Sequence, residues 1–415
     1  MKTIHIIIAK DRENKSVRTF FSKKFFLVKQ FFFIIASLIL ASCGDKSNKQ
    51  TEVIIVDVTE TYPAKEMHLQ DIADVKYVPL GSNEEFLIGD YFRIASVDDE
   101  RIVIFSRNHI FTFDPAGNPL TLINKTGQKK GEEYNSIYKS IIEPHQKKIL
   151  IFDLSQHKCL VFDLQGNYER DFPISTNNEY ITINDLENFD ENNLILYTEN
   201  LFEINKTPFL ILSKNDGKIM KQIEIPFEKI IIPAIVDAER GVAMSVNYKS
   251  IQLLKSGFLL TELSSDTIYH LSSSGQLSPF IARTPAIQSM NKPVFLLFGA
   301  ETVRYLFMST VVFKFDFESF TGFPETPLIY DKKEEQTYQC VLYNDDYPSK
   351  KQAGIENSTN FINTANATAV VLFQAYELIE AYKQGNLNGQ LKEIASKLTE
   401  DDNPVLMVAK FKNDL

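Results

Sequence analysis

The sequence predicts an all-β fold, a six-bladed β-propeller whose ring is closed by strands from both ends of the chain. The first observation is an eight-residue phrase, Phe-Thr-Phe-Asp-Pro-Ala-Gly-Asn at 111–118, which returns at 160–167 as Leu-Val-Phe-Asp-Leu-Gln-Gly-Asn. The second is a set of looser copies near 211–218, 268–276 and 328–333. An apolar run that meets Asp and then Gly-Asn indicates a strand entering a tight turn. Repeats of about 50 residues built from strands are typical of propeller blades.

The charge distribution excludes one class of partner. Of the 415 residues, 44% are apolar, and the formal net charge is −10. The first 42 residues carry eight Lys or Arg and two Asp or Glu, a net charge of +6, so the remaining residues carry −16. Nucleic-acid binding requires a basic surface that displaces counterions. We therefore expect no nucleic-acid partner, and we expect an anionic membrane surface to repel the body of the protein.

Residues 1–42 have the features of a signal peptide. Three lysines, Lys23, Lys24 and Lys29, precede an apolar run at 31–41 that is too short to span a bilayer. The run ends in Leu-Ala-Ser-Cys at 40–43, which resembles the bacterial lipoprotein signal. This resemblance implies cleavage before Cys43 and attachment of lipid to that residue, so the expected partner at this end is a membrane. An ordinary signal peptide and an uncleaved anchor remain as alternatives.

Residues 43–52 are polar and predict a tether between the lipid and a propeller at 53–415. The strand expected at 53–56 has no hairpin partner beside it, and we expect it to close the ring against the last strand-like run, 405–411. Such closure would leave no exposed sheet edge. The run at 75–80 is expected on the approach to the first blade.

Five regular blades are expected next. Their strands are predicted at 92–97, 102–105, 111–113 and 120–123; 137–143, 149–152, 159–162 and 168–172; 180–183, 194–198, 209–212 and 219–223; 251–254, 258–261, 268–271 and 277–281; and 294–298, 304–308, 328–330 and 337–340. Residues 226–247 are irregular and predict a long surface loop, and an aromatic insert at 311–323 is expected to extend a hairpin of blade five. Cys159 and Cys340 fall in strands, where buried thiols are expected and a disulfide between them is the alternative.

The sixth blade is interrupted. Its inner strand is predicted at 341–343 and a further strand at 368–373. A small helical insertion is then expected at about 374–399, because apolar residues follow helical spacing there. Gly385 is a stop signal for its first helix, and Asn388 opens the second. We expect these helices to pack on the outside or rim of the propeller.

The common catalytic and metal-binding motifs are missing, and no catalytic residue is assigned. The chain has no phosphate-binding loop, no His-Glu-x-x-His helix, no Cys-x-x-Cys pair and no Gly-x-Ser-x-Gly elbow. Two polar pairs remain as candidates: Asn184 and Asp185 are expected after the inner strand of blade three, and Asn344 and Asp345 after that of blade six. Inner strands line the channel, so these oxygen ligands could meet at one mouth and hold calcium. Turn formation is the alternative use of these residues.

The repeats, the run Val-Lys-Tyr-Val-Pro-Leu at 75–80 and the ending Asp-Asn-Pro-Val-Leu at 402–406 together resemble the six-bladed β-propeller lipoproteins of Bacteroides-type bacteria. The resemblance covers essentially all of residues 43–415. That family has no established activity, and its blades are distantly similar to NHL-type repeats.

The family has a glycine-rich phrase, Gly-x-Gly-Pro-Gly-Glu-Tyr, after the outer strand of its first blade. Here the phrase reads Gly-Gln-Lys-Lys-Gly-Glu-Glu-Tyr at 127–134, so Lys129 and Lys130 replace the Gly-Pro pair. Loops on a rigid scaffold often carry function. The candidate ligand loop therefore consists of Lys129, Lys130, Gly131, Glu132, Glu133 and Tyr134. A solvated loop without a ligand is the alternative.

The anchor, the repeats and the missing motifs predict a lipid-anchored binding or scaffold module outside the cytoplasm, with a protein or a glycan as its partner. The expected location is the bacterial cell envelope, at the outer membrane, on either its periplasmic or its outer surface. A hydrolase or lyase acting at the channel mouth, with or without calcium, is the alternative function. No other cofactor is expected.

Overall fold

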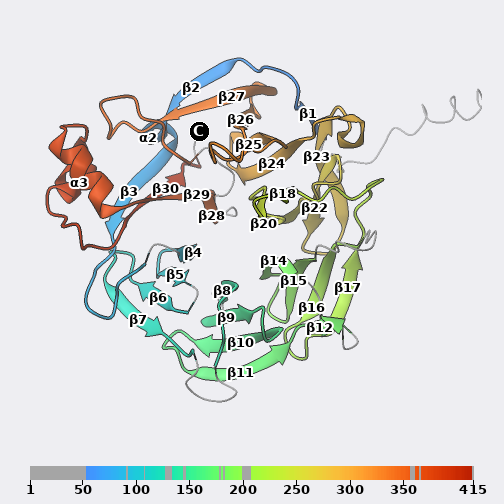
Figure 1. The fold of residues 1–415 in the computed structure, drawn as a ribbon, viewed down its shortest axis with the longest axis horizontal. Helices are drawn as coiled ribbons and strands as arrows, with labels where there is room; N and C mark the ends of the chain where they lie inside the picture. Colours follow the sequence, from blue (N-terminus) through green and yellow to red (C-terminus); the bar gives the residue numbers. More distant parts are fainter. Residues whose placement is uncertain are drawn as a thin grey trace, which may run out of the picture. The chain divides into compact units, whose positions relative to one another are not determined.

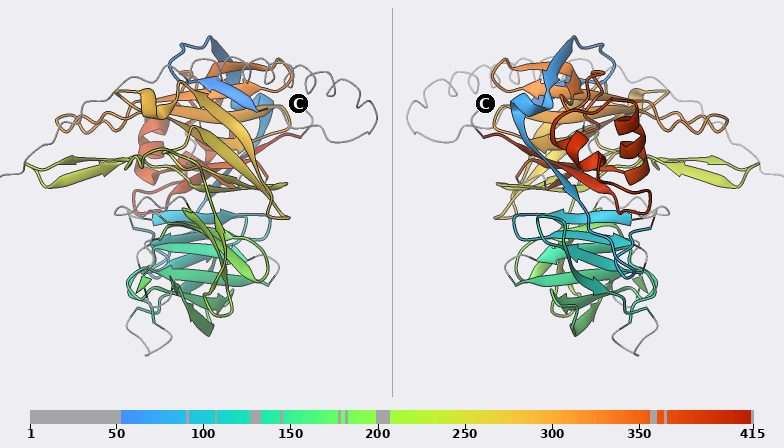
Figure 2. Two further views of the ribbon diagram at one scale, coloured as in Figure 1. Left: turned by 90° about the vertical axis from the view of Figure 1, so that its right-hand side faces the viewer. Right: turned by 90° about the vertical axis from the view of Figure 1, so that its left-hand side faces the viewer.

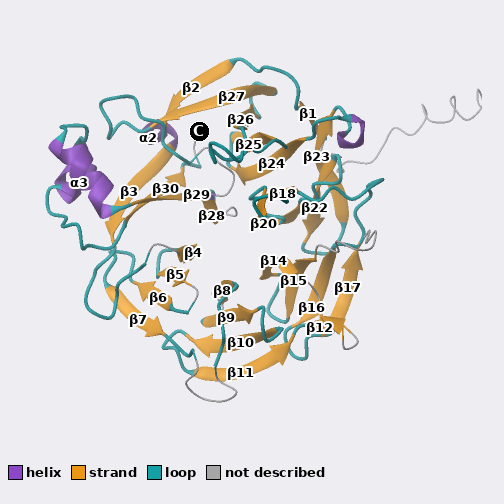
Figure 3. Ribbon diagram, viewed as in Figure 1, coloured by secondary structure: helices purple, strands orange, loops and turns teal. Residues whose placement is uncertain are grey.

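The computed structural model describes residues 53–89, 92–106, 108–126, 133–143, 146–176, 179–180, 183–198, 207–355, 360–363 and 366–413. Residues from Val53 onward form a compact unit in which six blades surround a central channel (Figure 1). Strands dominate this unit, and helix α3 (Ala375–Lys383) lies at its outer edge (Figure 3). The predicted six-bladed β-propeller is confirmed.

Each blade is a sheet whose strands follow one another from the channel outwards. Blade one consists of β4 (Phe92–Val97), β5 (Ile102–Ser106), β6 (Ile110–Phe113) and β7 (Pro119–Ile123), and blade two of β8 (Lys139–Glu143), β9 (Lys148–Asp153), β10 (Lys158–Asp163) and β11 (Tyr168–Pro173). Blade three consists of β14 (Ile183–Asn188), β15 (Asn193–Thr198), β16 (Phe209–Ser213) and β17 (Ile219–Ile223), and blade four of β20 (Ile251–Leu254), β21 (Gly257–Leu260), β22 (Thr267–Ser272) and β23 (Leu277–Thr284). Blade five consists of β24 (Val294–Glu301), β25 (Tyr305–Val312), β26 (Glu325–Asp331) and β27 (Gln336–Tyr343).

Blade six is assembled from both ends of the chain. Its order from the channel outwards is β28 (Phe361–Asn363), β29 (Thr368–Phe373), β30 (Val405–Phe411) and β3 (Ala73–Pro79). The N-terminal strand β3 runs antiparallel to β30, with Ala73 opposite Phe411 and Pro79 opposite Val405. Closure by strands from both ends is therefore confirmed. The run at 75–80 precedes blade one in the chain, as expected, but residues 75–79 belong to the outermost strand of blade six.

The N-terminal partner predicted for the last strand was wrong. Strand β1 (Ile54–Asp57) pairs in parallel with β23 of blade four. The next strand, β2 (Ala64–His68), pairs in parallel with β27 of blade five. The first strands thus lie outside blades four and five before the chain reaches blade six, and only the third closes the ring.

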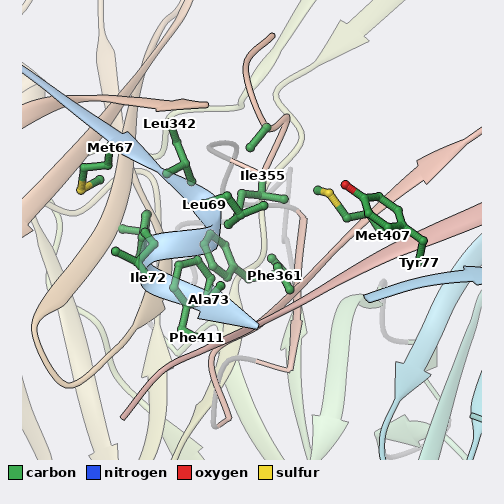
Figure 4. Packing of buried hydrophobic residues seen from close by; sticks show 14 of the residues in the cluster. Met67, Leu69, Ile72, Ala73, Tyr77, Leu342, Ile355, Phe361, Met407 and Phe411 are labelled. Carbon is green, nitrogen blue, oxygen red and sulfur yellow. The ribbon is translucent and has the colours of Figure 1, made fainter. Parts of the chain in front are cut away.

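A large core cluster stabilises this closure (Figure 4). Met67 of β2 and the short helix α2 (Leu69–Ile72), which follows β2, bury apolar side chains in the same cluster as Phe361 and Phe411 of blade six. Leu342 of blade five belongs to the same cluster. Because this cluster joins both chain ends to two blades, the apolar area buried on closing the ring stabilises it.

The repeated Asp-x-x-Gly-Asn phrase forms the tight turn between the third and fourth strands of blades one and two. Asp114 Oδ1 accepts hydrogen bonds from the backbone N–H groups of Ala116 at 2.9 Å and Asn118 at 2.8 Å. Gly117 has a φ of +92°, a conformation that side chains disfavour. The second copy repeats the arrangement, with the Asn167 N–H bonded to Asp163 Oδ1 at 2.8 Å. These local contacts explain why the two copies of the phrase form the same turn.

Several local expectations were corrected by the structure. Residues 341–343 belong to β27, the outer strand of blade five, and do not form the inner strand of blade six. The inner strand of blade three is β14, so it begins at the residue where the predicted strand ended. The predicted irregular stretch at 226–247 contains the hairpin of β18 (Ala234–Asp237) and β19 (Val242–Ser245). Two further small elements lie between blades: the pair β12 (Ser175–Thr176) and β13 (Glu179–Tyr180), and the 3-10 helix η2 (Ile287–Ser289).

The helical insertion lies between β29 and β30, as predicted. It consists of α3 and α4 (Gly389–Ala395), with Gly385 after the first helix and Asn388 as the N-cap of the second. Leu378 and Leu391 bury their side chains in the core cluster beside blade six. Within the described part of the chain, no helix has the length and apolar character needed to cross a membrane. The predicted thiols Cys159 and Cys340 are both buried and are not joined in a disulfide.

Candidate functional site

The two faces of the ring carry connections of very different length. Every blade follows the same path from the channel outwards, so all inner strands begin at one face. At the opposite face, no connection between consecutive strands of a blade is longer than five residues. The face at which the inner strands begin carries the long connections 224–250, 313–324, 344–360 and 374–404. We call these two surfaces the short-turn face and the long-loop face.

Two long connections project from the ring and contact each other. The hairpin of β18 and β19 extends away from the blades (Figure 2). Arg240 at its tip pairs with Glu318 of the insert between β25 and β26. Val236 on the hairpin is 66% exposed and Phe320 on the insert is 52% exposed. The long-loop face therefore presents exposed apolar side chains on projecting segments, a feature of interaction surfaces.

A charged cluster lies at the channel mouth on this face. Lys139 begins β8, and its ammonium donates to Asp185 Oδ1 at 2.6 Å and to Glu187 Oε1 at 2.7 Å, both on β14. Asp185 Oδ2 accepts the backbone N–H groups of Ser250 and Ile251 at 3.1 Å each, at the start of β20. These contacts connect the inner ends of blades two, three and four.

Lys249 extends the cluster to blade six. Its Nζ donates to the backbone carbonyl of Phe361 at 2.5 Å, at the start of β28. We refer to Lys139, Asp185, Glu187 and Lys249 as the channel-mouth cluster. Lys139 pairs with both carboxylates, and among the described residues Lys249 forms no ion pair. The ammonium of Lys249 thus retains donor capacity at the mouth.

The two lysines differ in their electrostatic surroundings. Burial of Lys139 disfavours its charge, but the carboxylates of Asp185 and Glu187 outweigh that effect and raise its pKa. Burial lowers the pKa of Lys249 to about 8, since its attraction to the same carboxylates is weaker. At neutral pH, Lys249 can therefore bind an anionic group or transfer a proton, whereas Lys139 holds the carboxylates in place.

The sequence-predicted polar pairs do not meet at this mouth. Asp185 lies in the channel-mouth cluster, while Asn184 lies at a β-bulge in β14 and its carbonyl accepts the Tyr138 hydroxyl at 3.1 Å. Asn344 follows β27, the outer strand of blade five, and donates to the Tyr77 hydroxyl at 2.9 Å. The expectation that both pairs follow inner strands was wrong, because the outer strand β27 continues to residue 343.

The predicted calcium site loses its geometric basis with that correction. Asp345 Oδ1 lies 2.5 Å from His68 Nδ1, in an exposed contact between blade five and the end of β2. No group of three or more His, Cys, Asp and Glu side chains suited to hold a metal ion occurs in the described ranges.

The candidate ligand loop falls in the connection 124–138, between β7 and β8. Its residues Lys129, Lys130, Gly131 and Glu132 lie outside the described residues, as does Cys43. Tyr134 is fully buried, and its hydroxyl donates to the Asn108 carbonyl at 2.9 Å. Burial also raises the pKa of Tyr134 to about 12. Tyr134 therefore anchors the loop to blade one. The Glu133 carbonyl accepts Gln156 Nε2 at 3.0 Å.

Sequence reasoning missed Lys139, Glu187 and Lys249. Lys139 is the first residue of β8, Glu187 lies within β14, and Lys249 precedes β20. A single charge at any of these places looks like an ordinary solvent-exposed residue of a strand or loop. The signal that could have found them is the recurrence of charge within or just before successive inner strands. That signal becomes informative only when the correct inner strands are known.

Comparison with known proteins places the chain in a family. The family described as a domain of unknown function, DUF4934, matches residues 53–410. The chain belongs to this family. The DUF4934 match spans all six blades, including the β3 and β30 strands that close the ring. No curated protein matches the chain.

Several solved structures are similar to this DUF4934 protein, to different degrees. A candidate exported protein from Bacteroides fragilis is 15% identical, with a TM-score of 0.58 over 87% of this chain and 100% of that one. A DUF4221 member from Bacteroides vulgatus is 11% identical, with a TM-score of 0.49 over 83% of this chain and 99% of that one. Virginiamycin B lyase from Staphylococcus aureus is 13% identical, with a TM-score of 0.32 over 61% of this chain and 73% of that one. The first likeness supports a shared fold, and the other two are too weak to support any conclusion.

Proposed function

We propose that this DUF4934 protein is a lipid-anchored binding module outside the cytoplasm that presents its long-loop face to a protein or glycan partner. The observation that carries the proposal is the unequal length of the connections on the two faces. Tight turns need only join strands, whereas connections of 12 to 31 residues on one face exceed what chain reversal requires. Long loops held by a rigid scaffold are typical of binding surfaces.

Two further features support a partner larger than a small molecule. The exposed Val236 and Phe320 lie on segments that project beyond the blades. The channel-mouth cluster supplies charged groups near the axis of the same face. An apolar contact combined with charged groups that set orientation is a usual composition for a recognition surface.

The proposed anchor is a lipid on Cys43, followed by the polar residues 44–52. Fully extended, these residues reach about 30 Å at roughly 3.3–3.6 Å each, enough to hold the propeller close to a bilayer while leaving it free to turn. The likeness to a candidate exported Bacteroides protein supports a location outside the cytoplasm. Within the cell envelope, the outer membrane is the proposed site.

The binding proposal is tested by cross-linking and capture from native membranes with the full chain. The test variant carries Val236→Asp and Phe320→Asp on the long-loop face. The matched control carries Leu120→Asp and Met220→Asp on outer strands, where the two side chains are also exposed, at 48% and 64%. We expect the control to recover the same partner as the wild type and the test variant to lose it. Equal recovery by both variants would contradict the proposal, and so would turnover of a substrate without any partner.

The anchor is tested separately with Cys43→Ser. We expect this variant to move from the membrane fraction to the soluble fraction, because the two acyl chains needed for stable attachment cannot form. A Cys43→Ala variant serves as a second control for the thiol. Retention of both variants in the membrane fraction would favour the uncleaved anchor.

An enzyme acting at the channel mouth is the second candidate function. The observation that favours it is Lys249, whose lowered pKa allows proton transfer near neutral pH. In this version, a hydrolase or lyase would use Lys249 as a base, with Asp185 and Glu187 positioned by Lys139. Turnover on a panel of glycans and lactones that disappears in Lys249→Met would support it. The same turnover in Lys249→Met would eliminate Lys249 as the base.

A further inference from the structure

A groove lies between helix α3 and the connection that follows β27. It has a volume of about 350 Å³ and is lined by Tyr347, Lys351, Phe373, Glu377, Leu378, Glu380, Ala381 and Gln384. Both connections that form it, 344–360 and 374–404, belong to the long-loop face. The groove is separate from the channel-mouth cluster, with which it shares no residue.

The base of the groove is aromatic. Tyr347 and Phe373 are 6% and 8% exposed, and their ring centroids lie 6.3 Å apart. Lys351 places its ammonium 4.5 Å from the centroid of the Tyr347 ring and 5.9 Å from that of Phe373. These distances are those of cation–π contacts, in which the negative face of an aromatic ring attracts a cation. The protein's own lysine thus shows that an alkylammonium group fits these two rings.

Carboxylates stand at the edge of the groove. Glu377 and Glu380 are exposed on α3. Burial raises the pKa of Tyr347 to about 12, and the negative charges of Glu377 and Asp346 act in the same direction. The negative potential that opposes ionisation of the tyrosine also favours a cation beside its ring. Glu377 Oε2 accepts the backbone N–H of Gln374 at 3.4 Å, and Glu380 Oε1 accepts the Gln384 side chain at 3.0 Å. Each carboxylate keeps its other oxygen for a second cation.

The walls of the groove are held in place. The Asp346 carboxylate accepts a hydrogen bond from the Tyr77 hydroxyl of β3 at 2.8 Å and one from the Gln70 side chain of α2 at 3.2 Å. The Asp346 carbonyl accepts the backbone N–H of Asn388, which caps α4, at 2.8 Å. The loop that carries Tyr347 is therefore fixed to both the ring and the helical insertion. A preformed site loses little conformational entropy on binding.

We propose that this groove binds a lysine side chain of a protein partner, and that Lys351 occupies it in the unbound state. The partner's ammonium would displace Lys351 from the two aromatic rings and pair with Glu377 and Glu380. Lys351 is exposed and held by its ring contacts, so it can move into solvent. The body of the protein, at −16 by sequence, attracts a basic partner over a longer range. This inference rests on the proposed binding function and specifies the chemistry of its partner.

The test measures probe binding to the full chain in detergent by saturation-transfer NMR titration. The probe is N-acetyl-lysine methylamide, and the neutral comparison is N-acetyl-norleucine methylamide, which has nearly the same shape. Lys351→Ala removes the internal competitor. Lys350→Ala is the matched control, because Lys350 lies over the Tyr343 ring at 5.4 Å and does not line the groove.

We expect Lys351→Ala to bind the lysine probe two- to fivefold more tightly than the wild type, the gain expected from removing an exposed cation–π contact. Lys350→Ala should match the wild type. Adding Glu380→Gln to Lys351→Ala should weaken the probe again, and this exposed substitution leaves the core unchanged. Equal affinity of the lysine and norleucine probes, or unchanged affinity in Lys351→Ala, would overturn the proposal.

The outcome can be separated from that of the proposed function. Capture of a partner that is insensitive to Lys351→Ala and Glu380→Gln, with no selective lysine-probe binding, would reject the groove and leave the binding module intact. Selective probe binding without any captured partner would support the groove and count against the binding module.

Discussion

Replacing Lys249 with methionine is expected to stabilise the protein at pH 7. In the folded protein, burial lowers the pKa of this lysine from 10.5 to about 8. At 1.36 kcal/mol per pH unit, that difference corresponds to about 3 kcal/mol of unfavourable free energy in the folded state. Methionine removes this term but also removes the hydrogen bond to the Phe361 carbonyl, which contributes about 1 kcal/mol. The net gain in free energy of unfolding is therefore about 2 kcal/mol.

The sign of the pH dependence follows from the lowered pKa. Below pH 8, both the folded and the unfolded state carry the charge, so the destabilisation of the wild type is complete. Between pH 8 and 10.5, the unfolded state binds more protons than the folded state, and the free energy of unfolding rises with pH. The advantage of Lys249→Met should therefore be about 2 kcal/mol at pH 7 and should vanish or reverse by pH 10.5.

Urea unfolding followed by circular dichroism at pH 7 and pH 10.5 measures both values. Lys255→Met is the matched control, since Lys255 is exposed at the other end of β20. Its effect should stay within about 0.5 kcal/mol at either pH. A Lys249→Met variant that is less stable than the wild type at pH 7, or whose advantage is the same at both pH values, would refute the reasoning.

Two further predictions concern the scaffold. Glu143 and Lys214 form an ion pair between blades two and three, with both side chains 4% exposed. Glu143→Gln should cost about 3–5 kcal/mol in urea unfolding because it leaves a buried ammonium without its counter-charge, whereas Glu143→Leu combined with Lys214→Met should cost less; equal losses would contradict this explanation. Gly117→Ala should lower the free energy of unfolding by at least about 1 kcal/mol, since its Cβ would lie 2.1 Å from the Pro79 carbonyl oxygen at a φ of +92°. Gly89→Ala, which meets no atom within 4 Å, is its control and should be close to neutral, so similar losses would show that steric contact is not the cause.

The blades could be predicted because their information is local. The Asp-x-x-Gly-Asn phrase marks its own turn, since Asp114 bonds to the backbone only two and four residues away. The apolar runs around it are continuous because both faces of each blade are covered by neighbouring blades. The helical insertion could also be predicted, because its apolar residues have helical spacing. Gly385 marks the end of its first helix and Asn388 the start of its second.

The remaining features depend on contacts between distant residues. The parallel pairing of β1 with β23 and of β2 with β27 leaves no mark in either short strand alone. The prediction ended the outer strand of blade five at residue 340, whereas β27 continues to Tyr343. Asn344 was therefore assigned to blade six, although it follows the outer strand of blade five. Only Asp185 of the candidate site was found. Its partner Lys139 is 46 residues away in sequence, and the two meet because neighbouring inner strands begin at the same face.

The position of β3 has a consequence for how the protein is made. A ribosome releases this strand early, yet its strand partner, β30, is among the last segments to be synthesised. Until then, residues 73–79 have an unsatisfied edge that other chains can join. Strands β1 and β2 likewise stay unpaired until their partners, more than 200 residues downstream, have been synthesised. The nascent chain therefore has to remain unaggregated through nearly the whole of translation before its architecture can be completed.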